Sequence, residues 1–332
     1  MPCAVVAGGF WGDEGKGKII SYLALKDGLD VCVRTGSVNA AHTIWFEGKR
    51  YALHMVPGGF VNGSCRLLIG AGANVHVAQF LKEVAETGVG GRIGVDSQAS
   101  VIEEKHSSQD KASEFLKGLG TTGWGVGPAV EERVRRTAKV ARDVPELKRY
   151  LADVAVETNE ALDSGKTVLL EGTQGLFLSL FHGSYPFVTS RDTSASAICS
   201  EAGVGPTRVD EVILVFKSFV TRVGTGPLPG EISKDEAVKR GWFETAAGTG
   251  RDRRSAPFSF ELGRKAAAIN GATQLAVTKL DCVFPECSGV RVFEDLSVEA
   301  KQFIDRVEVE TKVPVCFVGT GPDALDLIDR RK

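Results

Sequence analysis

The sequence predicts an α/β fold in which a mainly parallel central sheet is flanked by helices. Short apolar runs bounded by glycine alternate along the chain with segments of helical spacing. Fully buried parallel strands read as such continuous apolar runs, and the connecting helices cover the sheet. An apolar share of 43% in 332 residues is ample for this core. Because no composition shift marks a linker, we expect one domain, residues 1–332.

The elements follow in order. The first strand, Ala4-Val5-Val6-Ala7, runs into a glycine-rich loop and a predicted helix over 19–25. Later apolar runs predict strands at 31–33, 67–69, 168–170, 212–216, 275–277 and 315–318. Apolar residues at helical spacing, with mostly polar opposite faces, predict helices at 75–86, 144–162 and 298–309.

The loop after the first strand has the spacing of a phosphate loop. Gly12, four intervening residues, Gly17 and Lys18 fit the pattern, and the amides of the following helix can face an anion. Ile19 stands where a serine or threonine usually holds Mg²⁺, so the metal needs another oxygen ligand. Asp13 is the candidate, because a carboxylate beside bound phosphate is costly unless a metal or a proton transfer uses it. The sequence therefore predicts a P-loop-like nucleotide-binding fold; a glycine-rich turn with solvated charges is the alternative.

Charge and composition restrict the partners. A net charge of −2 is not the basic excess that nucleic-acid proteins need, so no nucleic-acid partner is expected. The apolar runs are shorter than a membrane span and no secretion signal precedes them, so we expect no membrane contact and a cytoplasmic location. The seven scattered cysteines are expected to be reduced core residues, with a metal or disulfide at Cys282 and Cys287 as the weaker alternative. The five histidines form no sequence-local metal cluster.

Further glycine-rich junctions follow predicted strands or precede helices, at 36–43, 120–128, 171–175 and 221–227. Each alone is typical of an ordinary turn. In an open α/β sheet, however, the loops at the carboxyl ends of the strands converge on one crevice. The carboxamide, imidazole, hydroxyls and arginines in these loops therefore predict a shared pocket.

Together these motifs resemble the adenylosuccinate synthetase family. The matching segments run in order over nearly the whole chain, at 11–18, 39–43, 121–123, 127–129, 171–175, 185–190, 221–224, 249–254 and 278–281. The chain is shorter than bacterial members and is similar to compact archaeal or viral forms. The resemblance implies the fold of this family, Mg²⁺ as cofactor, and a homodimer.

The resemblance also implies a reaction. The family joins L-aspartate to C6 of a 6-oxopurine 5′-monophosphate, with IMP giving adenylosuccinate through a 6-phosphoryl intermediate driven by GTP. Asp13 would take the N1 proton, His42 would stabilise charge on the leaving β-phosphate, and Gln174 would hold the purine and its 6-phosphoryl group. Mg²⁺ would be bound by Asp13 and the carbonyl of Ala41.

The resemblance assigns the binding residues as follows. The triphosphate would contact Gly12, Glu14, Gly15, Lys16, Gly17, Lys18, Ala41, His42 and Thr43. The donor base would contact Lys279, Asp281, Thr320 and Gly321. The purine monophosphate would contact Asp13, Asn39, Thr122, Arg136, Gln174, Thr189, Val223 and Arg251, with Arg136 reaching across from the second subunit. Aspartate would contact Thr249, Gly250, Arg251 and Arg253, whose guanidinium groups suit a dicarboxylate.

Several positions depart from the family pattern. The 35–43 loop is one residue shorter, and Ala41 replaces a glycine, so this loop must adopt a conformation allowed for alanine. Phe10 stands at a usual glutamine, Trp124 at an arginine that contacts aspartate, and Ala256-Pro257 at a usual Gly-Trp pair. Viral relatives use dGMP, often with an adenine triphosphate. The retained Asp13 favours IMP, and the alternative is dGMP and L-aspartate with ATP, dATP or GTP, giving N6-succino-2-amino-deoxyadenylate.

Two further alternatives come from other classes. A regulatory GTP-binding switch could use the phosphate loop with Lys279 and Asp281, but it leaves Arg251, Arg253 and Gln174 without a role. A non-catalytic nucleotide-binding scaffold would not need Asp13, His42 and Gln174 together.

Overall fold

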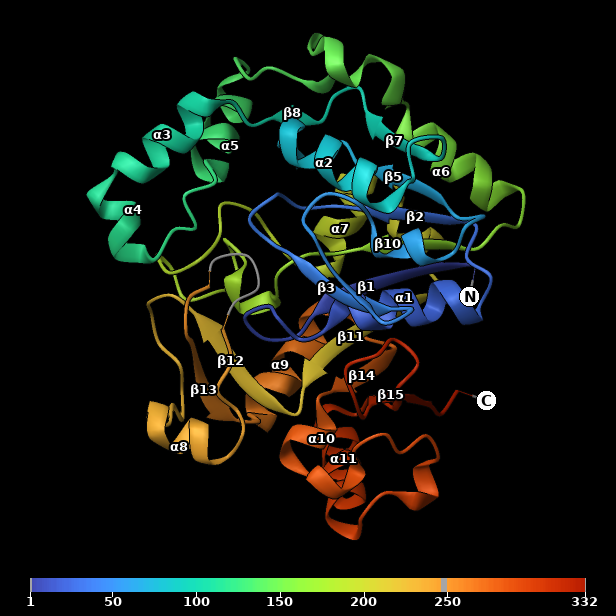
Figure 1. Cartoon of the computed structure of the whole chain (residues 1–332), viewed down its shortest axis with the longest axis vertical. Helices are drawn as coiled ribbons and strands as arrows, with labels where there is room; N and C mark the ends of the chain where they lie inside the picture. Colours follow the sequence, from blue (N-terminus) through green and yellow to red (C-terminus); the bar gives the residue numbers. More distant parts are fainter. Residues whose placement is uncertain (1, 246–249, 332) are drawn as a thin grey trace.

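A ten-stranded sheet forms the centre of the computed structural model, which describes residues 2–245 and 250–331 (Figure 1). Its spatial order is β16 (Leu327–Asp329), β15 (Val315–Gly319), β14 (Gln274–Thr278), β11 (Glu211–Lys217), β1 (Cys3–Gly8), β10 (Val168–Glu171), β2 (Val31–Arg34), β5 (Arg66–Ile69), β7 (Ile93–Asp96) and β9 (Leu151–Ala152). Neighbouring strands are parallel except β15 and β16. The mainly parallel α/β sheet expected from the sequence is confirmed.

Helices and smaller sheets surround this sheet. The helices are α1 (Lys16–Lys26), α2 (Val77–Thr87), α3 (Glu104–Ala112), α4 (Glu114–Leu119), α5 (Val126–Arg135), α6 (Val154–Asp163), α7 (Ala195–Ala202), α8 (Lys234–Lys239), α9 (Phe260–Asn270), α10 (Leu280–Val283) and α11 (Val298–Thr311). Three two-stranded sheets pair β3 (His42–Phe46) with β4 (Lys49–Leu53), β6 (Asn74–Val75) with β8 (Ser100–Val101), and β12 (Phe219–Val223) with β13 (Arg253–Pro257). In the part of the chain described, no helix is both long and apolar enough to cross a bilayer.

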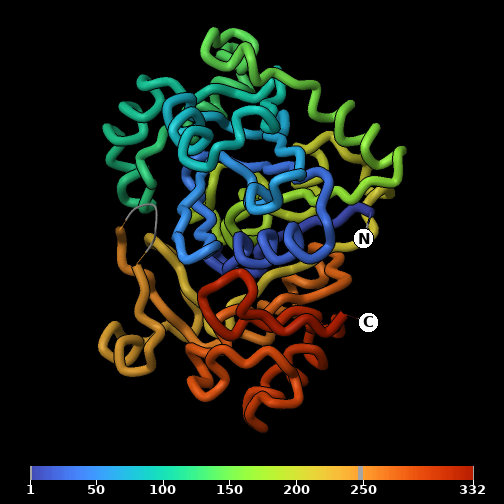
Figure 2. The backbone as a smooth tube through the Cα atoms, turned by 45° about the vertical axis from the view of Figure 1, so that its right-hand side comes forward, coloured from blue at the N-terminus to red at the C-terminus, as the bar shows by residue number. Residues whose placement is uncertain are grey.

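The alternation of side chains along β1 explains its continuous apolar run. Cys3, Val5 and Ala7 belong to the hydrophobic core on one face of the sheet, and Ala4 and Val6 belong to the core on the other face. Both faces of this central strand are covered, so every side chain along it is apolar. Figure 2 shows the two ends of the molecule: the cyan to green segments of α2 to α5 lie at one end, and the orange-red segments of α10 and α11 lie at the other.

The predicted helix over 144–162 is wrong in its first half. Residues Pro145–Tyr150 form a 3₁₀ turn, and Leu151–Ala152 then add strand β9 to the sheet beside β7. Helix α6 begins only after Asp153, whose carboxylate accepts the amide of Val156 as a helix cap. Sheet pairing therefore interrupts a segment whose apolar spacing suits a helix.

Phe10, which departs from the family pattern, lies in the core. Its side chain is 1% exposed, and its ring lies 4.8 Å from that of Phe216 and 5.2 Å from that of Phe258, measured between centroids. The amide of Phe10 instead supports the loop that follows β1, because it donates to Glu14. Phe10 therefore contributes aromatic packing beneath the loop.

Candidate active site

The loop between β1 and α1 is held open from inside by Glu14. Its carboxylate is buried, and Oε1 accepts the amides of Phe10 at 3.0 Å and Gly12 at 2.8 Å. Gly12, Asp13 and Gly15 have φ angles of 87°, 61° and 87°, a left-handed backbone that turns the loop towards the first turn of α1. The first amides of a helix have no partner within the helix. In α1 the amide of Lys18 donates to the carbonyl of Gly15, so the amides of Lys16 and Gly17 are the ones that remain for the anion cradle that the glycine spacing predicts.

The two lysines of this loop lie in different places. The ammonium of Lys16 donates to Glu14 Oε2 at 2.7 Å and to the carbonyl of Gln174 at 2.5 Å, so it stays inside the cradle. The ammonium of Lys18, which the phosphate-loop spacing predicts beside the triphosphate, donates to the carbonyls of Gly321, Asp323 and Asp326 at 2.8, 2.5 and 2.7 Å. All three of its N–H donors are therefore used, and Lys18 fastens α1 to the loop after β15.

The pKa of the Lys18 ammonium is lowered to about 8. The largest cause is burial, which disfavours the charged form. The carbonyl contacts compensate for the lost water without supplying a full opposite charge.

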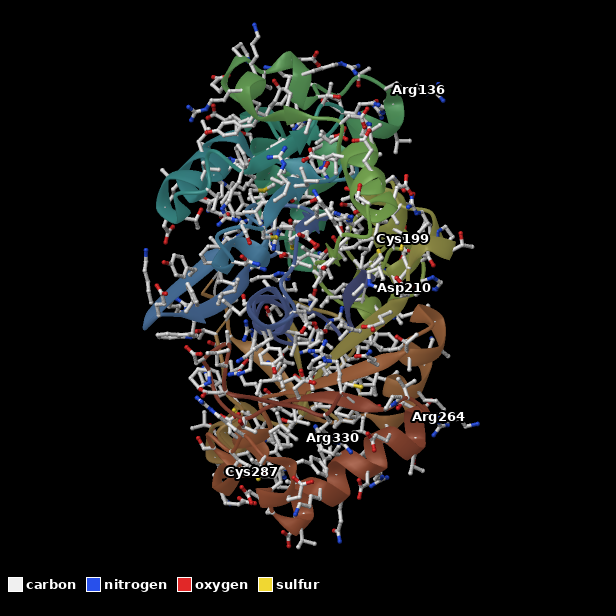
Figure 3. The ribbon with its side chains drawn as sticks, turned by 90° about the vertical axis from the view of Figure 1, so that its right-hand side faces the viewer. Arg136, Cys199, Asp210, Arg264, Cys287 and Arg330 are labelled. Atoms are coloured by element: carbon white, nitrogen blue, oxygen red, sulfur yellow. The ribbon has the colours of Figure 1, made fainter. Side chains whose placement is uncertain are left out.

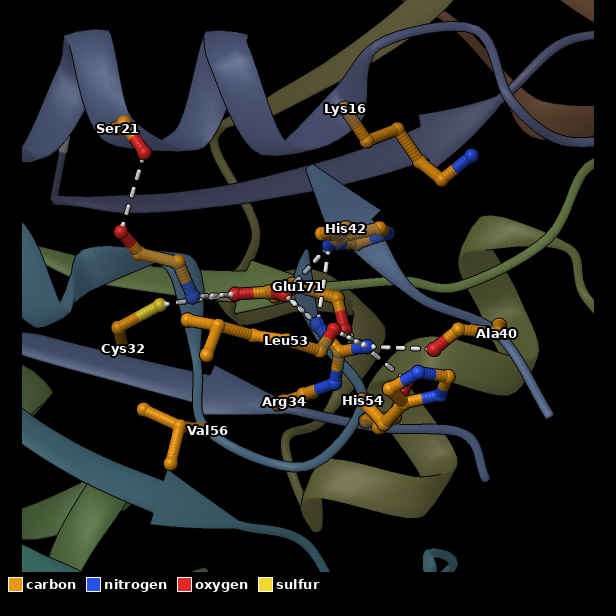
Figure 4. A network of polar contacts seen from close by, with 12 residues as sticks. Lys16, Ser21, Cys32, Arg34, Ala40, His42, Leu53, His54, Val56 and Glu171 are labelled. Carbon is orange, nitrogen blue, oxygen red and sulfur yellow. Dashed lines mark hydrogen bonds and ion pairs between the residues drawn. The ribbon is translucent and has the colours of Figure 1, made fainter. Parts of the chain in front are cut away.

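His42 belongs to a buried network centred on Glu171 (Figure 4). Glu171 is fully buried at the end of β10, and its Oε1 accepts from His42 Nδ1 at 2.7 Å and from the guanidinium of Arg34. Its Oε2 accepts the amide of Gly58 at 2.6 Å. Arg34 also donates to the carbonyl of Ala40 at 3.0 Å, within the 35–43 loop. With its Nδ1–H held by Glu171, the imidazole is fixed in one orientation.

The charge states in this network follow from burial and neighbours. Burial, helped by the nearby Arg34 charge, lowers the pKa of His42 to about 4. Burial alone would raise the pKa of Glu171, but Arg34, His42 and the amide of Gly58 outweigh it and lower that pKa to about 2. Near neutral pH the network therefore holds an ionised Glu171, a charged Arg34 and a neutral imidazole.

The phosphate cradle, His42 and Gln174 adjoin one another. A Cβ atom added to Gly17 in the first turn of α1 would lie 3.0 Å from Cβ of His42, and one added to Gly12 would lie 3.5 Å from Cα of Gln174. Ala41 has no left-handed backbone, so its added methyl group causes no strain of that kind. The structure thus brings together three of the loops that the sequence places at the ends of strands.

Left-handed backbone marks several of the predicted site residues. The φ angles are 61° at Asp13, 66° at Arg136, 64° at Gln174 and 58° at Lys279. Such angles are uncommon outside glycine, and they gather at functional sites where the surrounding fold enforces them. Among the described residues, Glu47 and Lys312 are the other two non-glycine cases.

The residues predicted for the donor base adjoin the same cradle. Thr278, at the end of β14, donates through Oγ1 to the carbonyl of Glu14 at 2.6 Å. Lys279 follows it, and its ammonium lies 2.6 Å from Oε1 of Glu244. Thr320 is buried and donates to the carbonyl of Val290 at 2.7 Å, so its hydroxyl supports the wall that Gly321 continues.

The residues predicted for the purine monophosphate fall into two groups. Thr122 and Arg251 line a cavity of about 640 Å³, whose other lining residues include Trp124, Lys111 and His76. The guanidinium of Arg251 donates to the carbonyl of Gly120 at 2.8 Å and to that of Thr121, which joins the predicted aspartate loop to this cavity. Val223 ends β12, and Thr189 lies half-buried where its amide donates to the carbonyl of Leu178. Of the residues predicted for aspartate, Thr249 lies outside the described residues and Gly250 is exposed.

Trp124 forms an aromatic wall of this cavity. Its ring lies 5.6 Å from that of His54 and 5.4 Å from that of His76. Arg253, predicted to bind aspartate, contacts the phosphate loop, with its Nε 2.9 Å from Oδ2 of Asp13. Arg136 is different, because it lies exposed just after α5 and projects from the edge of the molecule (Figure 3).

Two site residues were missed by sequence reasoning. Glu171 is the first residue of a matched motif and lies at the end of a buried strand. A carboxylate at such a position needs a buried partner, and this could have identified it from the sequence. Glu244 lies in the connection after α8, where no spacing marks it.

Other sequence expectations concern cysteine and metal. All seven cysteines are free thiols, including Cys282 and Cys287, so the disulfide alternative is wrong. Glu103, His106 and Glu132 do gather in space, but the ammonium of Lys105 lies 3.2 Å from Glu103 and 2.9 Å from Glu132. Lys139 lies 4.0 Å from Glu103, so two ammonium groups already face the two carboxylates of this cluster.

Comparison with known proteins gives a consistent result. The family model described as adenylosuccinate synthetase matches residues 5–146 and 137–286. The chain is 51% identical over 334 residues to adenylosuccinate synthetase of Archaeoglobus fulgidus and 52% identical over 337 residues to that of Thermococcus sibiricus, in each case covering 100% of this chain and 99% of the relative.

Solved structures show the same fold. The fully ligated adenylosuccinate synthetase of Plasmodium falciparum superposes with a TM-score of 0.92 at 24% identity, covering 100% of both chains. The succinoaminodeoxyadenylate synthetase of cyanophage S-2L, bound to dGMP and dATP, gives a TM-score of 0.84 at 24% identity, covering 99% of this chain and 95% of that one.

The Glu171 network yields a prediction about stability. Glu171→Gln keeps the shape of the side chain but leaves Arg34 buried without its countercharge, so we expect a loss of about 3–5 kcal/mol in the free energy of unfolding. Denaturant titration measures it. The matched control is Glu157→Gln, whose partner Arg66 is one-third exposed and whose loss should cost less than about 1 kcal/mol. Equal unfolding midpoints for the two variants would contradict the prediction that the buried ion pair contributes more to the free energy of unfolding than the exposed one.

Proposed function

The chain belongs to the adenylosuccinate synthetase family, and we propose that it joins L-aspartate to C6 of IMP in a ligase reaction driven by GTP hydrolysis. Relatives with about half of their residues identical over the full chain carry this name. The proposal assigns Asp13, His42 and Gln174 to catalysis, and the cradle of α1 to the triphosphate.

One observation carries the assignment of residues. Apart from Arg253 Nε, which is ion-paired with Asp13, buried polar atoms without a hydrogen-bond partner occur at four of the predicted site residues: Asn39 Oδ1, His42 Nε2, Gln174 Oε1 and Asp281 Oδ1. An unsatisfied buried polar atom is costly, and a bound ligand is one way to satisfy it. Three of these atoms match a substrate group directly: the purine for Asn39 and Gln174, and the guanine N1–H or N2–H for Asp281. Nε2 of the neutral His42 carries no hydrogen, but a bound phosphate anion favours protonation of the imidazole, and Nε2–H then donates to the phosphate.

The chemistry follows from these positions. The carboxylate of Asp13 takes the N1 proton of the purine, and the electron pair makes O6 a nucleophile that attacks the γ-phosphorus of GTP. The bond to the β-bridging oxygen breaks, and GDP leaves while His42 stabilises the charge on its β-phosphate. The amine of aspartate then attacks C6 and displaces inorganic phosphate, which yields adenylosuccinate.

We propose Mg²⁺ as the cofactor, held by Asp13 and the carbonyl of Ala41. Both ligands are oxygens, the donor type that this hard cation prefers, and Mg²⁺ commonly takes only one or two protein ligands beside substrate phosphates. Asp13 is exposed at the tip of the phosphate loop, where substrate phosphate oxygens can supply the remaining ligands of the ion. When bound, the ion neutralises phosphate charge.

We also propose a homodimer in which Arg136 completes the site of the second subunit. The support is its exposed position directly after α5, where it is the C-cap of that helix and its side chain is free to reach another subunit. An isologous two-fold dimer places each Arg136 at the other copy's site.

Removal of the proposed base tests the mechanism. Asp13→Asn should lower kcat by at least about 10²-fold because the amide cannot accept the N1 proton, while the affinity for IMP stays nearly unchanged. The rate is followed by absorbance and product mass, and IMP affinity by calorimetry. Full activity in this variant would remove Asp13 from the mechanism.

A substrate matrix decides between the candidate nucleotides. We expect IMP with GTP to give the highest kcat/KM among IMP, GMP and dGMP tested against GTP, ATP and dATP. If the pocket binds guanine through Asp281, kcat/KM with ATP or dATP should be lower than with GTP by a factor on the order of 10⁴. If dGMP with dATP proves fastest, the reaction is the viral type; if GTP is hydrolysed without purine or aspartate, the protein is a switch.

Mixing of inactive variants tests the shared site. Arg136→Leu and Asp13→Asn should each be inactive alone, but a mixture allowed to exchange subunits should regain about a quarter of the wild-type activity, since half of the dimers then hold one intact site. Activity is measured before and after exchange. No recovery, with exchange confirmed by mass, would place Arg136 outside the neighbouring site.

A further inference from the structure

A second buried carboxylate, that of Glu244, gathers three cations. Its side chain is 12% exposed and lies after α8, just before the segment that leads to Arg251. Oε2 accepts from Lys217 at 2.7 Å and from Arg253 at 2.5 Å, and Oε1 lies 2.6 Å from the ammonium of Lys279. These partners come from the end of β11, the start of β13 and the junction of β14 with α10.

The network continues from Arg253 to the phosphate loop. While its Nη1 is held by Glu244, its Nε lies 2.9 Å from Oδ2 of Asp13. Under the proposed function, Lys279 serves the donor base, Arg253 serves aspartate and Asp13 acts on the purine. One carboxylate is therefore in contact with residues of two different substrate sites, and through Arg253 it reaches the third.

Three cations, Lys217, Lys279 and Arg253, contact the single carboxylate of Glu244. Burial alone would raise the pKa of Glu244, but Lys217, Lys279 and Arg253 outweigh it and hold the pKa well below its usual range, so the carboxylate stays ionised. Arg253, whose side chain is 12% exposed, keeps N–H groups that Glu244 does not use, and the carboxylates of aspartate are anions that such groups attract.

We propose that Glu244 is a positioning residue that couples the donor-base site to the aspartate site by holding Lys279 on one oxygen and Arg253 on the other. The proposal rests on the proposed function. Held in this way, Lys279 presents its methylene stem to the base, and Arg253 directs its remaining N–H groups to Asp13 and to the incoming carboxylate. A change at Lys279 then reaches Arg253 through a single side chain.

Substitution at Lys279 gives the first test. Lys279→Met removes a half-exposed ammonium, so it leaves no buried charge unpaired and should fold. At saturating GTP and IMP, we expect this variant to have a KM for aspartate raised about tenfold, a factor typical of coupling between two linked sites. The KM for IMP should stay within about twofold of the wild-type value. An effect confined to the KM for GTP would overturn the coupling.

Substitution at Glu244 separates positioning from charge. Loss of a negative charge alone predicts that Glu244→Gln binds aspartate more tightly, whereas loss of positioning predicts a KM raised about tenfold. In the Glu244→Gln background, Lys279→Met should then have no further effect on that KM. Tighter aspartate binding, or effects of the two substitutions that simply multiply, would overturn the proposal.

A matched control comes from the same strand. Glu231 pairs with Arg254, the neighbour of Arg253, through Nε at 2.7 Å, but outside the network. Glu231→Gln should leave every KM within about twofold. A wild-type protein that does not consume IMP, GTP and aspartate would overturn the proposed function and the coupling together; normal turnover with an unshifted KM for aspartate in Lys279→Met would overturn the coupling alone.

Discussion

The ion pair that Glu171 forms with Arg34 is the constraint on which the site depends. Both groups lie at the carboxyl ends of neighbouring strands, β10 and β2, and neither can be left buried without the other. Through the same carboxylate, His42 at the start of β3 and Gly58 in the following turn are fixed relative to the sheet. The hairpin that carries the His42 imidazole is therefore held against the sheet by charge as well as by apolar packing.

Much of the fold could be predicted because buried parallel strands have a local signature. The apolar runs at 31–33, 168–170 and 212–216 all lie in strands of the sheet. The exception at 144–162 arises because the pairing of β9 with β7 depends on a distant strand, which local spacing does not report. The loops of the site were predicted from their place at strand ends, and the structure brings His42 and Gln174 to the phosphate loop as that rule requires.

The rest of the site could not be predicted because it depends on contacts between residues far apart in sequence. Lys18 fits the spacing of a phosphate-binding lysine, yet its donors are used by a loop more than 300 residues later. Glu244 carries no motif at all, and only the folded chain shows which cations surround it. Spacing identifies which backbone can cradle an anion, whereas the partners of a long flexible side chain are decided by tertiary packing.

The position of β1 in the sheet has a consequence for how the protein is made. Of the ten strands in the sheet β1 comes first in the sequence, yet it pairs with β10 and β11, whose register begins at Val168 and Glu211. At a synthesis rate of about 5–20 residues per second, its apolar edge stays uncovered for roughly ten to thirty seconds before β10 emerges. The nascent chain is therefore exposed to aggregation during most of its synthesis, and its folding is expected to be slow and to benefit from chaperones that cover hydrophobic segments.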